Sequence, residues 1–185
     1  MGQNKQLLPV RDEPAIRFCI RQILDAGIET LIVVLGANRE KIRPVLADLP
    51  VRIAVNDQSG SQMSDSVSCG LSKMPDSVTG IMIALCDHPL VSSMTYAALN
   101  ALYYQTPDSI LLPVYKGRGG HPTVFPRSLC QAVDDCIPLN QVVRSHSDSV
   151  CRMPIDDPAI VLDMDTPDDY QRMLNLIPRL SRLGI

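Results

Sequence analysis

The sequence lacks tryptophan and is poor in aromatic residues, which make up only 4% of its 185 residues. It has 17 basic and 20 acidic residues, a net charge of −3, and no block of lysine or arginine. Such a chain offers neither a platform on which bases could stack nor a basic surface that could follow a phosphate backbone. These absences argue against a nucleic-acid partner.

Long apolar runs are also missing. No segment approaches the roughly 18 apolar residues that a membrane span needs, and the stretch from Gln3 to Gln6 is polar, unlike an export signal. We therefore expect a cytoplasmic protein without a membrane partner. Because 45% of the residues are hydrophobic, a chain of this length can bury one core, and we expect a single domain over residues 1–185.

Paired-cysteine motifs are absent as well. The six cysteines form no CxxC pair and no Cys/His cluster with zinc-site spacing: they are Cys19, Cys69, Cys86, Cys130, Cys136 and Cys151. Most have apolar neighbours, and small buried thiols are common in ordinary cores. We expect reduced, packed thiols, with a metal or redox role as the alternative.

The sequence does contain alternating helix and strand signals. Continuous apolar runs at 31–35 and 81–85 suit strands covered on both faces, as in a parallel sheet between helices. This alternation predicts a three-layer α/β/α sandwich around a mostly parallel sheet. The other expected strands are 51–55, 110–115, 122–125 and short ones near 150 and 160, and the expected helices are 12–27, 39–49 with a kink at Pro44, one ending at 74, 92–104, 129–133, 139–144 and one after 167.

Two acidic segments are the first candidates for a site, because ligands of open α/β sheets gather at the carboxyl ends of the strands. Asp87 directly follows the run at 81–85, and Asp163 and Asp165 precede the last expected helix. Carboxylates from distant segments could together hold one Mg²⁺, which prefers oxygen ligands and shares them with substrate phosphates. Alternatively, Asp87 forms a turn, and Thr-Pro-Asp-Asp from Thr166 only starts a helix.

Other polar residues lie beside turns and loops. Three glycines within 117–120 predict a tight turn, where Arg118 and His121 contact a substrate or serve the turn alone. Lys5 either binds phosphate or is solvated. Short hydrogen-bonding side chains in the loop 56–66 could serve a base, a ribose or the backbone of the loop.

Five segments, taken in chain order, form one pattern. They are Met-Gly-x-x-Lys-Gln-Leu-Leu-Pro at 1–9, Asn56 with Met63 and Ser66, Leu-Cys-Asp-His-Pro-Leu-Val at 85–91, Gly-Arg-Gly-Gly-His-Pro-Thr-Val-Phe at 117–125, and Asp-Met-Asp-Thr-Pro-Asp-Asp-Tyr at 163–170. Together they resemble the nucleotidyltransferases related to molybdenum cofactor cytidylyltransferase, over nearly the whole chain. The resemblance implies a Rossmann-like fold of the nucleotide-diphospho-sugar transferase type.

The same resemblance implies transfer of CMP from CTP to the terminal phosphate of molybdenum-molybdopterin, with release of pyrophosphate and with Mg²⁺. Alternatives are guanylyl transfer from GTP, transfer to another phosphorylated small molecule, and a non-catalytic carrier that delivers the cofactor to a molybdenum enzyme. By the same resemblance, Asp87 and Asp165 hold the metal, with Asp163 as a weaker candidate for the second ligand, and Lys5 neutralises phosphate charge. The implied nucleotide-binding residues are Lys5, Asn56, Met63, Ser66 and Asp87. Arg118 and His121 are implied to bind the pterin substrate.

The chain departs from the family pattern in three places. The family opens with a buried strand and a glycine-rich loop, whereas this sequence begins at the Met-Gly segment, so the strands at 31–35 and 81–85 would each lack a pairing partner. We expect an in-frame upstream extension that encodes both features. Gln62 stands where the family has glycine, close to the base. Of the family's Gly-Asp-x-Gly-Ala-Arg stretch, only Arg144 survives.

Overall fold

The structure, a computed structural model, describes residues 4–58, 60, 62–134 and 138–177. Its α-helices are α1 (Ala15–Asp25), α2 (Arg39–Ile42), α3 (Met63–Leu71), α4 (Ser93–Gln105), α5 (Arg127–Asp134), α6 (Leu139–Ser145) and α7 (Pro167–Leu174). Short 3₁₀ helices are η1 (Lys5–Leu7), η2 (Arg43–Leu46), η3 (Ser147–Ser149) and η4 (Pro158–Val161). The strands are β1 (Pro9–Val10), β2 (Glu13–Pro14), β3 (Ile32–Leu35), β4 (Arg52–Val55), β5 (Gly80–Ile83), β6 (Ile110–Tyr115), β7 (Arg118–Gly119), β8 (Thr123–Pro126) and β9 (Val150–Pro154).

The strands form a mixed arrangement. β3 pairs with β4 and β6 pairs with β9 in parallel, whereas β8 is antiparallel to both β5 and β6. β7 forms a short hairpin with β6, and β1 pairs with β2. The expectation of a mostly parallel sheet is corrected in this respect. The reason is the glycine-rich turn at 117–120, which returns the chain without a crossover helix and so makes its neighbours antiparallel.

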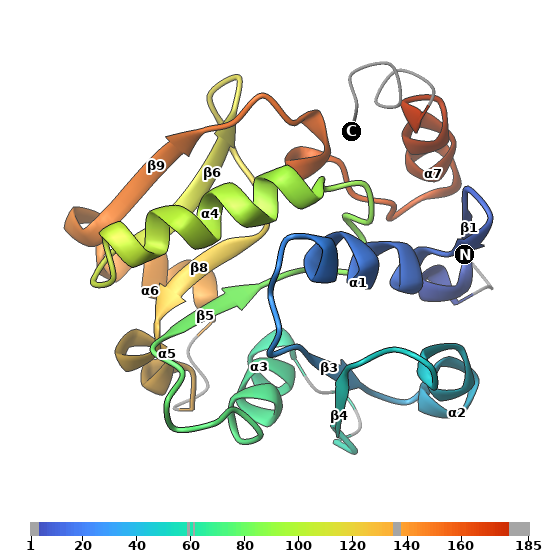
Figure 1. The fold of residues 1–185 in the computed structure, drawn as a ribbon, viewed down its shortest axis with the longest axis horizontal. Helices are drawn as coiled ribbons and strands as arrows, with labels where there is room; N and C mark the ends of the chain where they lie inside the picture. The colour runs from blue at the N-terminus through green and yellow to red at the C-terminus, as the bar shows by residue number, and fades with distance from the viewer. Residues whose placement is uncertain (1–3, 59, 61, 135–137, 178–185) are drawn as a thin grey trace.

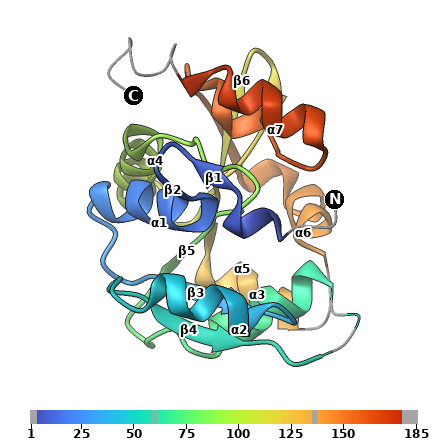
Figure 2. The same ribbon diagram turned by 90° about the vertical axis from the view of Figure 1, so that its right-hand side faces the viewer.

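Helices cover both faces of the strands, as Figures 1 and 2 show. On one face, Leu99 and Tyr103 of α4 pack against Leu111 of β6. On the other, α5 and α6 pack against a cluster that contains Ile110 and Phe125. Because consecutive residues of a strand point to opposite faces, neighbouring positions of β6 serve different cores. The α/β sandwich expected from the sequence is confirmed.

Two expected elements differ in kind. The helix expected at 39–49 is the short α2 followed by η2, since Pro44 lacks the N–H that would continue an α-helix. The strand expected near residue 160 is wrong, because that segment is η4. There the Asp157 carboxylate accepts the Ala159 N–H at 2.9 Å, and Pro158 occupies the first turn, where its fixed φ favours a helix.

β3 and β5 are less covered than their apolar sequences predict. Only Leu35 in β3 and Ile81 in β5 are buried, and the other residues of both strands are half-buried. Within the described residues, β3 pairs only with β4 and β5 only with β8. Each strand therefore leaves one edge without a strand partner, as the sequence analysis expected.

No disulfide joins the described cysteines, which are Cys19, Cys69, Cys86, Cys130 and Cys151. Cys136 lies outside the described residues. Burial raises the pKa of the Cys19 thiol to about 11, which keeps it protonated at neutral pH. Across the described part of the chain, no helix combines the length and the apolar character needed to span a bilayer.

A buried carboxylate ties α4 to the segment around η4. Asp157 is 2% exposed and accepts hydrogen bonds from the Ser92 N–H and hydroxyl, both at 3.0 Å, and from the Thr95 hydroxyl at 2.7 Å. With the Ala159 N–H, four donors converge on one side chain. The start of α4 and η4 are thereby held together.

Replacing Asp157 by alanine strands these donors in a buried place. Because each stranded donor costs about 1–3 kcal/mol, we expect Asp157→Ala to lower the free energy of unfolding by about 3 kcal/mol or more. Asp156→Ala is the matched control, since Asp156 is the exposed neighbouring aspartate. Urea denaturation at neutral pH measures both, and equal losses in the two variants would contradict this role.

Candidate functional site

The loop after β5 and the segment before α7 lie side by side. The Met164 N–H donates a hydrogen bond to the Asp87 carbonyl oxygen at 3.0 Å. This backbone contact joins two parts of the chain that are far apart in sequence. It brings together the two acidic segments on which the sequence analysis placed the metal.

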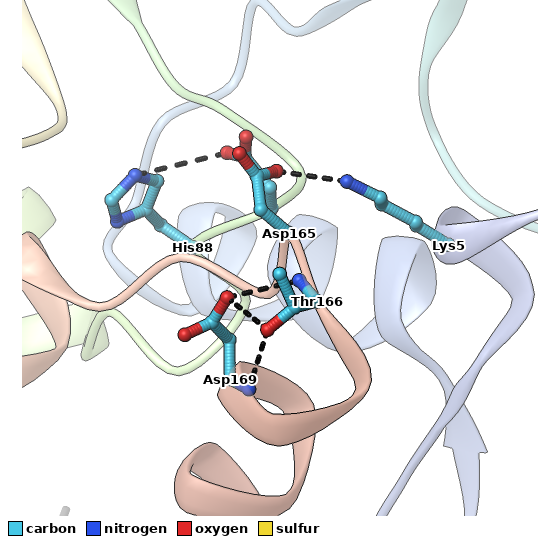
Figure 3. Close-up of polar contacts among 6 residues, drawn as sticks. Lys5, His88, Asp165, Thr166 and Asp169 are labelled. Atoms are coloured by element: carbon cyan, nitrogen blue, oxygen red, sulfur yellow. Dashed lines mark hydrogen bonds and ion pairs between the residues drawn. The ribbon is translucent and has the colours of Figure 1, made fainter. Parts of the chain in front are cut away.

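Lys5, in η1, completes this group. Its Nζ lies 2.8 Å from Oδ1 of Asp165, and the two side chains are 35% and 60% exposed. In Figure 3, the Lys5 ammonium points at the Asp165 carboxylate. An ion pair this open to solvent adds little to stability, so its partners are available to a charged ligand.

Asp87 is half-buried, with 35% of its side chain exposed, and its two oxygens are not equally accessible. Its Oδ1 is buried and accepts no hydrogen bond within the described structure. Nε2 of His88 lies 3.8 Å from this oxygen, beyond hydrogen-bond distance. A buried carboxylate oxygen without a donor is costly, so this atom is suited to receive a cation or a donor from a ligand.

Two histidines adjoin Asp87. The rings of His88 and His121 lie 5.5 Å apart between centroids, and Nδ1 of His121 is buried with no hydrogen-bond partner in the described structure. Burial lowers the pKa of His121, and the nearby His88 lowers it further, although the Asp87 charge acts in the opposite direction. His121 is therefore neutral near pH 7 and can donate or accept one hydrogen bond at each ring nitrogen according to its tautomer.

The position of His121 depends on the glycine before it. A β-carbon on Gly120 would lie 2.1 Å from the carbonyl oxygen of Ile160. The same oxygen accepts the His121 N–H at 2.9 Å. Glycine is needed here because the backbone passes directly against η4. This contact fixes the position of the His121 backbone.

The expected nucleotide loop forms a second group, between β4 and α3. Asn56 is buried, its Nδ2 donates to the Ser66 hydroxyl at 3.3 Å, and its Oδ1 accepts the Gln58 N–H at 3.1 Å. Met63 is 54% exposed at the start of α3. The Gln62 N–H donates to the Asp65 carboxylate at 2.7 Å as part of a capping box. Asn56 therefore shapes the loop, whereas Met63 faces outward.

The remaining sequence candidates are more peripheral. Arg118 in β7, Asp163 and Arg144 in α6 are exposed, and within the described residues none of them forms an ion pair. The sequence analysis gave His88 no role, although it adjoins Asp87. Its proximity to His121 depends on the pairing of β5 with β8, which no local sequence signal reveals.

The fold is an α/β sandwich in which two acidic segments meet beyond the carboxyl end of β5. Residues 1–150 match the MobA-like NTP transferase domain, so the chain belongs to this family of enzymes. The match covers most of the chain and contains Lys5, Asp87 and His121.

Solved structures agree with this assignment. The crystal structure of Rv0371c from Mycobacterium tuberculosis H37Rv superposes with a TM-score of 0.85 and 27% identity, over 95% of this chain and 91% of that one. Its complex with manganese gives a TM-score of 0.81 and 28% identity, over 94% and 93% of the two chains. A nucleotidyl transferase from Methanothermobacter thermautotroptrophicus shares the fold at a TM-score of 0.77 and 19% identity, over 95% and 86%.

The curated relatives align with only part of this chain and part of their own length. Nicotine blue oxidoreductase of Paenarthrobacter nicotinovorans is 30% identical over 136 residues, which are 70% of this chain and 65% of that protein. The bifunctional protein GlmU of Mycolicibacterium paratuberculosis is 31% identical over 104 residues, 52% of this chain and 21% of GlmU. The chain thus spans about a fifth of the GlmU protein that it matches.

A capping box holds the segment that carries Asp165. The Asp169 carboxylate accepts the Thr166 N–H at 2.9 Å and the Thr166 hydroxyl at 2.6 Å, and the Thr166 hydroxyl accepts the Asp169 N–H at 3.1 Å (Figure 3). These bonds to Thr166, supported by Arg172, lower the pKa of Asp169. The start of α7 is fixed directly behind Asp165.

This capping box makes stability depend on pH. Because the pKa of Asp169 is lower in the folded protein, its contribution is complete above the unfolded value of about 4 and is lost as pH falls through the folded value. When the pH is lowered from about 6 to about 3, we expect the free energy of unfolding to fall less in Asp169→Asn than in the wild type. Urea midpoints across this range measure the effect, with Asp168→Asn as the control in the same turn. A wild-type pH dependence in Asp169→Asn would show that the box contributes nothing.

Proposed function

We propose that the protein transfers CMP from CTP to the terminal phosphate of a molybdopterin-type cofactor that carries molybdenum, in a Mg²⁺-dependent reaction. The observation that carries the proposal is the buried, unpartnered Oδ1 of Asp87 beside the Lys5–Asp165 ion pair. Family membership supports nucleotidyl transfer, and the motifs at 5–9 and 120–122 resemble the cytidylyl branch more than the guanylyl branch.

The proposed reaction needs no covalent enzyme intermediate. An oxygen of the acceptor's terminal phosphate attacks the α-phosphorus of CTP, and the bond from that phosphorus to the oxygen bridging to the β-phosphate breaks. Pyrophosphate leaves with the electron pair. The protein must align two anionic groups and neutralise their charge, which is the main catalytic demand of phosphoryl-type transfers.

The residues present fit a magnesium ion. Mg²⁺ keeps several waters and is held by one or two carboxylates together with substrate phosphates. Asp87 and Asp165 meet that need, and within the described residues no larger cluster of metal-ligating side chains occurs. When bound, the ion would neutralise charge on the α-phosphate and on the leaving pyrophosphate. The manganese complex of Rv0371c supports the use of a divalent cation.

Lys5 has a role that follows from its ion pair. If Asp165 held a cation, its carboxylate would attract the Lys5 ammonium less strongly, because its charge would be shared. The ammonium could then donate to a phosphate oxygen. In the proposal, Lys5 binds the triphosphate and keeps Asp165 paired before the nucleotide arrives.

The two substrates occupy different sides of this centre in the proposal. Neutral His121, with Nδ1 unpartnered, offers a hydrogen bond to the pterin, and Arg118 offers a charge to the same substrate. Asn56, Met63 and Ser66 lie on the nucleotide side, where the bond between Asn56 and Ser66 fixes the loop. GTP in place of CTP and a different phosphorylated acceptor are the alternatives.

Removal of either carboxylate tests the metal assignment. We expect Asp87→Ala and Asp165→Ala to lower pyrophosphate release from CTP and the cofactor by about 10³-fold or more, since charge stabilisation of the transition state is lost. Asp168→Ala, an exposed aspartate on α7, is the control and should keep the wild-type rate. Thermal unfolding confirms that the variants are folded. A wild-type rate for folded Asp87→Ala would rule out the assignment.

The same assay separates the alternatives. Faster turnover with GTP than with CTP would replace cytidylyl by guanylyl transfer. Tight binding of the cofactor without turnover of either nucleotide, with or without Mg²⁺, would identify a carrier.

A further inference from the structure

Asp87 and His88 are neighbours in a tight turn after β5. The His88 N–H donates to the Leu85 carbonyl oxygen at 3.1 Å, which closes the turn, and the Asp87 carbonyl oxygen accepts the Met164 N–H at 3.0 Å. The backbone of both residues is therefore held in place. Their side chains converge, because Nε2 of His88 lies 3.8 Å from Oδ1 of Asp87 (Figure 3).

The other ring nitrogen of His88 fixes the orientation of the ring. Nδ1 lies 3.4 Å from the Ala159 carbonyl oxygen, and because a carbonyl oxygen can only accept, Nδ1 carries a proton and donates. Ala159 is held in turn, since its N–H donates to the buried Asp157 carboxylate at 2.9 Å. The His88 side chain is only 10% exposed. Histidines that ligate metals usually have this arrangement, in which one nitrogen donates to a backbone carbonyl and the other is presented to the ion.

The space between Asp87 and His88 suits a cation. Oδ1 of Asp87 is buried and has no hydrogen-bond partner within the described structure. In the neutral His88 ring, Nε2 carries a lone pair once Nδ1 holds the proton. Two electron-rich atoms therefore lie 3.8 Å apart, too far for a direct hydrogen bond. Because metal–nitrogen and metal–oxygen bonds are each about 2.1 Å long, one ion can contact both atoms.

We propose that Nε2 of His88 is a ligand of the cation that Asp87 holds, and that the site consequently binds divalent transition metals, Mn²⁺ among them, more tightly than Mg²⁺. This inference rests on the proposed function, because it concerns the cation that accompanies the nucleotide. Within the part of the chain that the structure describes, no three ligand-type side chains are grouped closely enough to hold an ion alone. Water and triphosphate oxygens fill the remaining positions.

The nitrogen ligand decides which cation is favoured. Mg²⁺ takes oxygen ligands in nearly ideal octahedral geometry and keeps several waters, so an imidazole adds little to its binding. Divalent transition metals gain more from a nitrogen ligand, and Mn²⁺ stands at the weak end of that series. A preference for Mn²⁺ over Mg²⁺ is therefore a stringent sign of the His88 ligand.

Pulsed electron paramagnetic resonance of bound Mn²⁺ tests the ligand directly. The full chain is saturated with Mn²⁺ and CTP, and the echo is recorded for the wild type and for His88→Gln, His121→Gln and His146→Gln. We expect modulation from an imidazole nitrogen in the wild type and its loss in His88→Gln alone. His121 is included because its ring lies beside that of His88, at 5.5 Å between centroids, and His146, which follows α6, is the remote control.

The outcomes separate this inference from the proposed function. Bound Mn²⁺ without imidazole modulation, or modulation that persists in His88→Gln, would overturn the inference and leave the proposed function standing. A protein that binds neither Mn²⁺ nor Mg²⁺ in the presence of CTP would overturn both.

The affinities of the two ions distinguish a ligand from a residue that only packs. Glutamine keeps a polar side chain at position 88 but offers an oxygen in place of the ring nitrogen. We expect His88→Gln to weaken Mn²⁺ binding by about tenfold or more and to leave Mg²⁺ binding nearly unchanged. Calorimetric titration with each ion, in the presence of CTP, measures this difference. A packing role would weaken both ions alike, and equal losses would contradict the ligand assignment.

Discussion

The backbone hydrogen bond from Met164 to Asp87 holds together the two acidic segments on which the site depends. Neither segment belongs to a strand of the sheet, so their alignment rests on contacts of this kind. The Asp157 network anchors η4 on one side, and the Thr166–Asp169 capping box anchors α7 on the other. The carboxylates of Asp87 and Asp165 are positioned by these bonds, and their own oxygens remain available to ligands.

The two carboxylates differ in a way that suits a shared cation. Asp87 is half-buried and has one buried oxygen without a donor, whereas Asp165 is more open to solvent and is paired with Lys5. A metal–triphosphate complex brings both the cation that Asp87 lacks and the anion that Lys5 can take. Neutral His121 adjoins this charged group without adding to the repulsion or attraction. The site is thus built for a ligand that carries both signs of charge.

Local signals predicted most helices and strands. Ser92 caps α4 by accepting the Thr95 N–H, and Thr166 with Pro167 starts α7, as their residue types indicate. The segment near Ile160 was mistaken for a strand because its apolar residues outweighed the helix start at Asp157 and Pro158. The antiparallel β8 was missed because strand direction depends on how a turn returns the chain to the sheet.

The site assignment stays a prediction, but the positions of some candidate residues could be inferred from the sequence. Asp87 follows a strand, and Asp165 precedes a helix, so their positions at one edge of the sheet could be inferred from order alone. The position of His88 beside His121 could not be inferred, because His121 lies just before β8, whose pairing with β5 no local signal reveals. The assignment of Asn56 to the nucleotide stays a prediction, and the structure adds that its side chain forms hydrogen bonds within its own loop. Such contacts depend on the packing of whole elements.

The most direct test of the central claim is a calorimetric titration of the protein with CTP in the presence and absence of Mg²⁺. If Asp87 and Asp165 hold a cation together with the triphosphate, CTP binds about tenfold or more tightly when Mg²⁺ is present, because the ion links the nucleotide to both carboxylates. An affinity for CTP that does not change with Mg²⁺ would contradict the account.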